Sequence, residues 1–368
     1  MTLTKSRPIL LGAIAALVVL GAVAGCGSEP EPIKIGAIVP LSGRLKSIGE
    51  AARDGMVLAA DEINGRGGIN GRLIELVVED GSDGPDETRQ AFIRLEKEHQ
   101  PLFYISVRAP ITEALRGFAQ ANEVVLFPVA AIAGEEEAMG GWIFQHTSRH
   151  GVSGSLALPL RALLDKLNVN SLGYLCVNPA FSKFHLEEVK EVFDGNVRAP
   201  ALEPNEVDFS GHVQELFDTD ALYILGLAPP QYRALLSQLE QAGYQGTVIG
   251  AFVSPLELVT QPSAQGTYHL ASIIYNPDYL FAREFASSYE SRFDKRIFES
   301  AAISYDIMHI FADLMEGEEL TRENLRQVLD QGFSYSGVFG EVNASPGTRD
   351  ITFGMHVTQI VDGKVEYR

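Results

Sequence analysis

Residues 64–72 read NGRGGINGR, and the elements on either side of this run decide the fold of the segment. An amphipathic helix pattern precedes the run, and the apolar stretch LIELVVE at residues 73–79 follows it. A dinucleotide-binding loop has the spacing G-x-G-x-x-G and lies after a strand and before a helix, so that the helix N-terminus faces the phosphates. Here the spacing differs and the order is helix, loop, strand. We therefore interpret the run as a helix C-cap and a tight turn, and not as a phosphate-binding loop.

Helices and strands alternate along most of the chain. Ser47-Ile48-Gly49-Glu50 fits a capping box at the start of the first helix. Strands are predicted at residues 33–39, 73–79, 102–106, 124–127, 171–177, 197–201, 221–225 and 247–251, with helices between them. This alternation predicts parallel sheets with right-handed crossovers. Because the 368-residue chain is too long for one ordinary core, two α/β lobes with doubly wound parallel sheets are expected.

The last third of the chain departs from this alternation. Three helices are predicted near residues 279–293, 301–315 and 322–331, and short strands surround Val361-Asp362-Gly363-Lys364. The Asp-Gly pair suits a two-residue hairpin turn. A chain of this kind is expected to return to the first lobe and to finish on the second.

The first 25 residues are typical of a secretory signal. Lys5 and Arg7 precede an apolar segment at residues 9–23 that is short for a membrane span. Val23-Ala24-Gly25-Cys26 resembles a bacterial lipobox, in which Cys26 becomes N-terminal and diacylated after cleavage. An ordinary secretory signal with a chance cysteine and a short anchor helix are the alternatives. Residues 26–32 would then form a polar tether, and two acyl chains would suffice for stable anchoring.

Charge and cysteine content restrict the partners. Removing residues 1–25 takes away Lys5, Arg7 and no acid, so the net charge changes from −19 to −21. Such a surface repels nucleic acid and anionic lipid, so we expect no nucleic-acid partner and membrane contact through the lipid anchor alone. Cys176 lies in an apolar run and is predicted to be a buried thiol.

No set of residues in the sequence matches a catalytic or metal site. His146 and His150 are four residues apart, but no further His or Cys lies near them, so polar loop residues are favoured over a zinc pair. Residues 151–155 (GVSGS) fail the nucleophile-elbow pattern at the last position. Residues 135–137 (EEE) are interpreted as a solvated helix start and not as a calcium site. We predict neither an enzyme nor a cofactor or metal.

Several motifs together resemble those of a known family. They are Pro40-Leu41-Ser42-Gly43 after the first strand, Ile48-Gly49, Asp61-Glu62-Ile63-Asn64 followed by Gly67-Gly68-Ile69-Asn70-Gly71, Glu79-Asp80, and Ser304-Tyr305-Asp306. In this order they resemble the type I periplasmic solute-binding proteins, in the leucine/isoleucine/valine and amide-binding group of ABC transporters. The likeness covers nearly the whole chain after residue 32.

The resemblance implies an organisation and a mode of action. Lobe I would comprise residues 33–146 and 275–334, and lobe II residues 147–274 and 335–368. Three segments would cross between the lobes, near residues 145–148, 271–275 and 334–338. A small-molecule ligand would bind in the cleft at the carboxyl ends of the strands, the lobes would close by hinge motion, and an ABC permease would recognise the closed form. The protein would be a monomer, anchored by lipid on the extracytoplasmic face of the cell envelope.

The resemblance also places the ligand contacts, at Ile48, Arg108, Ala109, Thr112, Ala130, Ala131, Phe181, Ala228 and Phe252. Ala109 and Ala131 stand where relatives carry hydroxyl groups, and Phe252 stands near the position of an acid that pairs with the ligand ammonium. The charged groups of an α-amino acid would then be buried unpaired, at a cost of several kcal/mol. We therefore expect a different ligand, with an anionic or carbonyl-bearing group held by Arg108 beside a helix N-terminus.

Two alternatives to transport fit the same sequence. The chain could be a sensory module that passes ligand state to a membrane receptor, and the sequence does not separate this from transport. It could also be an enzyme or a cell-envelope factor on the same fold, because fold does not fix function.

Overall fold

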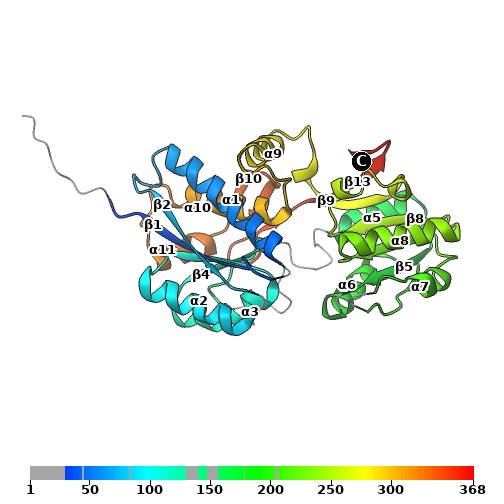
Figure 1. Cartoon of the computed structure of the whole chain (residues 1–368), viewed down its shortest axis with the longest axis horizontal. Helices are drawn as coiled ribbons and strands as arrows, with labels where there is room; N and C mark the ends of the chain where they lie inside the picture. The colour runs from blue at the N-terminus through cyan, green and yellow to red at the C-terminus, as the bar shows by residue number, and fades with distance from the viewer. Residues whose placement is uncertain are drawn as a thin grey trace, which may run out of the picture.

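The computed structural model describes residues 30–368 except 44, 83, 130–139, 147–155, 178 and 204–205. The side chains of residues 109, 179–181 and 184 are also outside the described set. Two α/β lobes lie side by side along the long axis of the molecule, with the first described residues at the far end of lobe I (Figure 1). The prediction of two lobes with doubly wound sheets is confirmed. Within the described residues, no helix is both long enough and apolar enough to cross a bilayer.

Lobe I is built on a four-stranded parallel sheet in the order β2-β1-β3-β4. The strands are β1 (Ile33–Val39), β2 (Ile74–Asp80), β3 (Phe103–Val107) and β4 (Val125–Val129). One face carries α1 (Lys46–Gly65), α9 (Leu280–Phe293), α10 (Glu299–Met315) and α11 (Arg322–Asp330), and the other carries α2 (Pro85–Glu98) and α3 (Ala109–Ala121). Because side chains alternate along a strand, Ile35, Ala37 and Val39 of β1 pack into the first core, whereas Ile38 packs into the second.

The NGRGGINGR run is a sharp turn, as predicted. Gly67, Gly68, Asn70 and Gly71 all have positive φ, and the backbones of Ile69 and Arg72 exchange two hydrogen bonds of 2.9 Å. A Cβ added to Gly68 would meet the Arg72 carbonyl oxygen at 2.0 Å, so only glycine fits there. The loop connects α1 to β2 and therefore presents no helix N-terminus to a phosphate.

The predicted capping box at Ser47 is not formed. Helix α1 begins at Lys46 with Leu45 at the N-cap, and no side chain caps it. Ser47 therefore lies inside the first turn, where its hydroxyl does not have the N-cap geometry. The helix is instead held by tertiary packing against α10, where Gly55 and Ala301 allow close approach of the two backbones.

Lobe II is built on a seven-stranded sheet in the order β14-β13-β9-β8-β7-β5-β6. Its strands are β5 (Ser171–Cys176), β6 (Asn196–Arg198), β7 (Ala221–Leu225), β8 (Thr247–Ala251), β9 (Tyr268–Ser272), β13 (Met355–Val361) and β14 (Lys364–Tyr367). Helices α5 (Ala157–Lys166) and α6 (Pro179–Val192) cover one face, and α7 (Ser210–Glu215) and α8 (Pro229–Ala242) cover the other. Three short 3-10 helices follow β8 and β9: η1 (Pro255–Glu257), η2 (Pro262–Ala264) and η3 (Ile273–Tyr275).

The sheet of lobe II is mixed, because the C-terminal strands join the predicted parallel strands in antiparallel orientation. Strand β13 is antiparallel to β9 and to β14. The β13–β14 turn is the predicted Asp-Gly hairpin, in which Asp362 and Gly363 both have positive φ. Cys176 is a buried thiol at the end of β5, as predicted.

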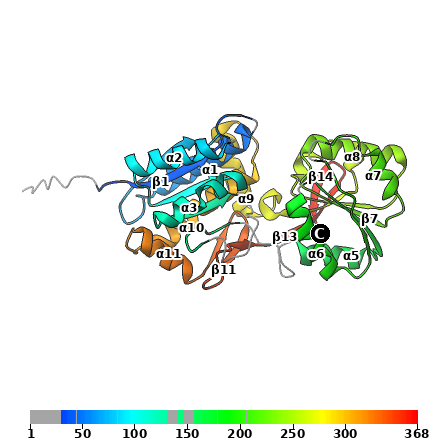
Figure 2. The same ribbon diagram turned by 90° about the horizontal axis from the view of Figure 1, so that it is seen from below.

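The third crossing between the lobes lies later than the predicted residues 334–338. Strands β10 (Phe333–Gly337), β11 (Gly340–Ala344) and β12 (Thr352–Phe353) form a separate antiparallel sheet whose residues pack into the core of lobe I. The next strand, β13, is already in the sheet of lobe II, and Figure 2 shows β11 on lobe I with β13 leading away from it. The chain therefore changes lobe beside Met355, which packs against both cores. The boundary predicted at residue 335 was wrong because a β-hairpin, and not a crossing, follows α11.

Candidate functional site

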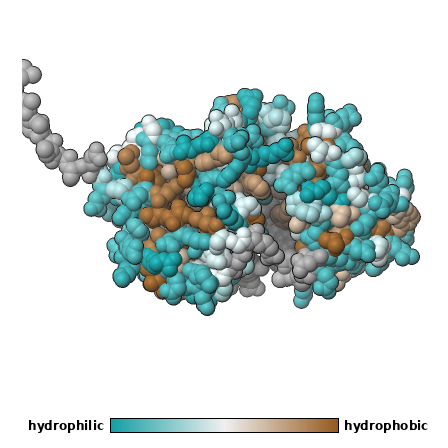
Figure 3. Space-filling view, in the orientation of Figure 1, coloured by the Kyte–Doolittle hydropathy of each residue, from teal (hydrophilic) through white to brown (hydrophobic). Residues whose placement is uncertain are grey.

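The carboxyl ends of the strands of both lobes point toward the space between the lobes. The strands of lobe I run from the tether end toward lobe II (Figure 1). Strand β9 leads directly into η3, whose Ile274 belongs to the core of lobe I, so the end of β9 faces lobe I. Strands β8, β7 and β5 are parallel to β9 and therefore end on the same side. A recess lies between the lobes on the face shown in Figure 3. Ligands of open α/β sheets bind at such strand ends.

On lobe I, Arg108 occupies a strained turn at this end. It follows β3 directly, is exposed, and has φ 81° and ψ 138°. Positive φ is uncommon for a residue with a long side chain, and its combination with an extended ψ is a strained conformation. Its guanidinium has no hydrogen bond or ion pair with any described residue, and it stands at the N-cap of α3, where the helix dipole favours an anion.

The hydroxyl of Thr112 stabilises this turn from inside. Thr112 and Ser106 are fully buried, and their Oγ atoms are 2.7 Å apart. The Thr112 hydroxyl also donates to the Arg108 carbonyl oxygen at 3.2 Å. Thr112 was predicted to contact the ligand, but its lack of exposed surface places it behind Arg108, in a supporting position.

Asp80 organises the two neighbouring loops at the same end of lobe I. Its carboxylate accepts hydrogen bonds of 2.8 Å from the backbone N–H groups of Leu41 and Ser82. Burial alone would raise the pKa of Asp80, but these bonds and one from Ser42 lower it. Ile48, a predicted ligand contact, follows in α1 and is partly buried.

On lobe II, Phe252 occupies a position similar to that of Arg108 on lobe I, directly after a strand and with positive φ. It follows β8 directly, has φ 58°, and its side chain is 46% exposed. Ala228 lies at the end of the neighbouring β7, at the N-cap of α8, and is also exposed. Phe252 therefore presents a partly exposed phenyl ring at this strand end, where further burial by a ligand would be favourable.

The crossing segments meet beside these strand ends. Burial raises the pKa of the Tyr275 hydroxyl, on the second crossing, and the side chain of Ser254, two residues after Phe252, opposes this shift. His146, the last described residue of lobe I before the first crossing, is fully buried, and its ring contacts those of Phe339 and Phe353. His146 Nε2 is 3.6 Å from Oδ2 of Asp306, and Oδ1 of Asp306 accepts from the Val338 N–H at 3.1 Å.

Two residues at the start of α10 were missed by the sequence prediction. Phe298 is the N-cap of α10 and is 39% exposed, and Glu299 is the first helical residue. The Ser300 hydroxyl donates to the Ile48 carbonyl oxygen at 3.1 Å, so α10 begins beside the start of α1, at the end of lobe I that carries Arg108. Since almost 200 residues separate them from Arg108, no local pattern could have grouped them with it.

Some of the predicted positions cannot be placed. Cys26, Ala130, Ala131 and His150 lie outside the described residues. The backbones of Ala109 and Phe181 are placed in α3 and α6, but their side chains are not described. Among the described residues, no group of three or more His, Cys, Asp or Glu could hold a metal ion.

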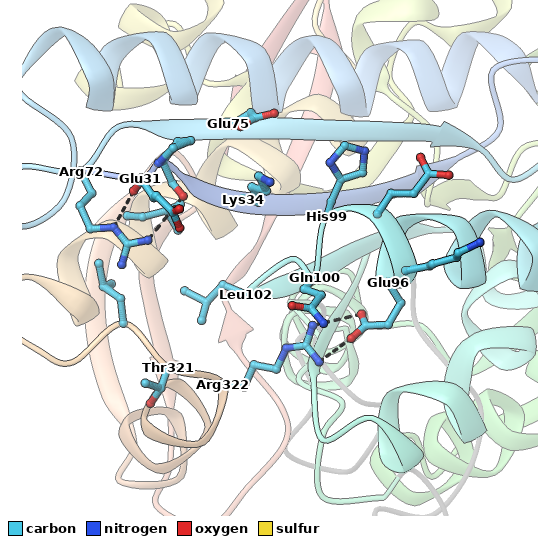
Figure 4. A pocket seen from close by; sticks show the side chains of 15 residues that line it. Glu31, Lys34, Arg72, Glu75, Glu96, His99, Gln100, Leu102, Thr321 and Arg322 are labelled. Atoms are coloured by element: carbon cyan, nitrogen blue, oxygen red, sulfur yellow. Dashed lines mark hydrogen bonds and ion pairs between the residues drawn. The ribbon is translucent and has the colours of Figure 1, made fainter. Parts of the chain in front are cut away.

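A second hollow lies at the opposite end of lobe I. This polar groove of about 920 Å³ is lined by residues at the amino ends of β1 and β3, including Glu31, Lys34, Glu75 and His99 (Figure 4). Arg72 donates there to the carbonyl oxygens of Glu31 and Pro32, which fixes the end of the tether on lobe I. The groove lies at the amino ends of the strands, whereas ligands of open α/β sheets bind at the carboxyl ends.

Comparison with known proteins decides the family. The family model described as "Periplasmic binding protein" matches residues 32–364, almost the whole described chain. The chain belongs to the periplasmic binding protein family. The two lobes, three crossings and facing strand ends of this binding protein are the type I arrangement, as the motifs predicted.

Relatives of this binding protein belong to the branched-chain amino acid group. It is 22% identical to a leucine-, isoleucine-, valine-, threonine- and alanine-binding protein of Pseudomonas aeruginosa, over 62% of this chain and 63% of that one. The matched regions cover less than two thirds of the length of the curated relatives. Its fold is similar to that of LivJ of Streptococcus pneumoniae in complex with isoleucine (TM-score 0.76, 22% identity, 91% and 98% of the two chains). It is also similar to a solute-binding protein of Rhodopseudomonas palustris BisB5 in complex with 3,4-dihydroxybenzoic acid (TM-score 0.75, 20% identity, 92% and 95%).

Proposed function

We propose that this protein is the solute-binding component of an ABC importer, and that it binds a small organic ligand between its lobes by hinge closure. The observation that carries the proposal is the pairing of Arg108 and Phe252. Each follows a strand directly, each has positive φ, and each is exposed at the end of its lobe that faces the other lobe. Closure would bring a charged group and an apolar group onto one ligand without any chemical step.

The proposed ligand is uncharged or singly anionic and partly apolar. Arg108 supplies a guanidinium that no described acid neutralises, beside a helix N-terminus. Phe252 and Phe298 supply exposed rings at the facing ends of the two lobes. The backbone positions of Ile48, Ala109 and Ala228 near these strand ends agree with further apolar contacts, and relatives of this fold hold both amino acids and aromatic acids.

The proposed location is the extracytoplasmic face of the cell envelope, with Cys26 as the lipid anchor. The support is the sequence Val23-Ala24-Gly25-Cys26 after an apolar segment, followed by a short tether whose end is fixed on lobe I by Arg72. We expect a Cys26→Ser chain to lose partitioning into the detergent phase of a Triton X-114 extract. Partitioning equal to that of the parent chain would contradict the anchor.

A ligand panel tests the function. We expect aromatic carboxylates or short aliphatic acids to raise the melting temperature, and leucine, isoleucine and valine to leave it unchanged at micromolar concentration. Each ligand group buried without a partner costs about 1–3 kcal/mol, and more when charged. Two such losses would move a micromolar dissociation constant toward millimolar, since about 1.4 kcal/mol is tenfold. A ligand at about 100 times its dissociation constant adds roughly 2.7 kcal/mol of stability, which thermal unfolding detects readily.

Two phenylalanine variants complete the same experiment. Phe252→Ala should weaken binding of the active compound tenfold or more, because burying a Phe side chain contributes about 1.5–3 kcal/mol. Phe217→Ala is the matched control, since Phe217 is also 46% exposed but follows α7, away from the strand ends. Equal affinities of the two variants would contradict the proposed site. Recovery of a converted product in place of the added ligand would contradict a binding protein without chemistry.

A further inference from the structure

The first turn of α10 brings a carboxylate to the proposed ligand site. Glu299 is the first residue of the helix and follows the exposed Phe298. The neighbouring Ser300 hydroxyl is bonded to the carbonyl oxygen of Ile48, which fixes this turn at the end of lobe I where its strands terminate. Glu299 is also close enough to His146 of the first crossing and Tyr275 of the second to interact electrostatically with both. It therefore lies where the crossings meet the facing ends of the lobes.

Among the described residues, the carboxylate of Glu299 lacks the partners that other buried or partly buried acids have. Asp54 pairs with Arg53 and Lys295, Glu62 accepts from Tyr305, and Glu96 pairs with Arg322. Glu299 has no hydrogen bond or ion pair with any described residue, although its side chain is only partly exposed. Burial raises the pKa of Glu299, and the nearby His146 opposes this shift only in part. A carboxylate partly removed from water is stabilised by a hydrogen-bond donor, and lobe closure would remove more of its water.

We propose that Glu299 is a specificity-determining residue of the ligand site, and that its carboxylate accepts a hydrogen bond from a hydroxyl or uncharged N–H group of the ligand. The inference rests on the proposed function and narrows the ligand class. Arg108 and Glu299 belong to different elements, the β3–α3 turn and the start of α10, so they bind different groups of the ligand. The ligand then carries an acidic or carbonyl group, an apolar body and a separate donor, and a second carboxylate at Glu299 is disfavoured by like-charge repulsion.

Matched probes with and without the donor test this assignment by calorimetry. We expect the parent chain to bind 3,4-dihydroxybenzoate at least about tenfold more tightly than benzoate, because hydrogen bonds to charged groups are among the strong ones. Glu299→Gln keeps the size of the side chain and removes its charge, and Glu299→Met also removes the acceptor oxygens. We expect the affinity ratio to fall in Glu299→Gln and to approach one in Glu299→Met, while benzoate binding is retained or improved.

Glu257→Gln is the control, because Glu257 is another partly exposed acid that interacts electrostatically with Tyr275 but lies on η1 of lobe II. In Glu257→Gln, the ratio of the affinities for 3,4-dihydroxybenzoate and benzoate should equal that of the parent chain. Retained benzoate binding shows that a variant is folded. If both probes bind the parent chain and the ratio is unchanged in Glu299→Met, or if the parent chain prefers benzoate, the inference is overturned and the proposed function stands. If neither probe binds the parent chain, the aromatic-acid class is overturned and the inference is withdrawn with it.

Discussion

Gly55→Ala is expected to destabilise lobe I, by an amount at the upper end of the roughly 1–3 kcal/mol that overpacking costs. Gly55 is buried in α1, and a Cβ at this position would meet the carbonyl oxygen of Ala301 in α10 at 2.1 Å. Backbone atoms of a packed helix cannot move aside as a flexible side chain can, so the two helices must separate. Urea unfolding, followed by circular dichroism, measures the change.

Gly65→Ala is the matched control in the same helix. Gly65 is the last residue of α1, and a Cβ there would meet nothing within 4 Å. Since alanine favours the helix over glycine by up to about 1 kcal/mol, this variant should be as stable as the parent chain or more stable. If Gly55→Ala behaved like Gly65→Ala, the close approach of α1 and α10 would be wrong.

Acid is expected to destabilise lobe II through His269. The side chain is fully buried in β9, Nε2 is 2.9 Å from the Thr267 hydroxyl, and burial lowers the pKa of His269 from 6.5 to about 3. Between these two values the unfolded chain binds a proton that the folded chain does not, so stability falls as the pH drops below 6.5. At pH 5 the loss from this residue should be about 2 kcal/mol, because each pH unit below the unfolded pKa costs about 1.4 kcal/mol.

The measurement compares unfolding free energies at pH 7 and pH 5, above the range in which most carboxylates titrate. In His269→Asn, the loss of unfolding free energy between pH 7 and pH 5 should be smaller than in the parent chain by most of that amount, about 2 kcal/mol. This holds whatever the absolute stability of the variant. Burial also lowers the pKa of the half-buried His356, so His356→Asn should remove a smaller share of the difference. A difference that is the same in His269→Asn and the parent chain would contradict a neutral buried imidazole.

The sequence predicted the elements of the fold well where the signal was local. The helix-to-strand order around NGRGGINGR, the Asp362-Gly363 hairpin and the buried Cys176 depend on φ preferences and on the apolar pattern of neighbouring residues. The predictions failed where the partner of an element was needed. The β10–β11 hairpin and the antiparallel β13 look like ordinary short strands in the sequence, and only pairing shows which lobe each one joins.

In the candidate site, too, some residues could be predicted from the sequence and others only from the fold. Arg108 and Phe252 could be proposed from motifs, because each follows a strand whose end is visible in the sequence. Their positive φ could not be foreseen, and neither could the burial of Thr112 behind the turn. Phe298 and Glu299 reach the candidate site because α10 packs on α1, and the Ser300–Ile48 hydrogen bond between these helices joins residues 252 positions apart.

By itself, the sequence of this protein determined which segments are helices and strands, that two doubly wound lobes result, and that the chain resembles a family of binding proteins. The tertiary structure alone decided where the chain changes lobe for the third time, which helix start lies beside Ile48, and that Glu299 has no partner among the described residues. The physical reason is the range of the interactions. Backbone preference and side-chain periodicity act over a few residues, whereas strand pairing, helix approach and desolvation depend on residues that only the folded chain brings together.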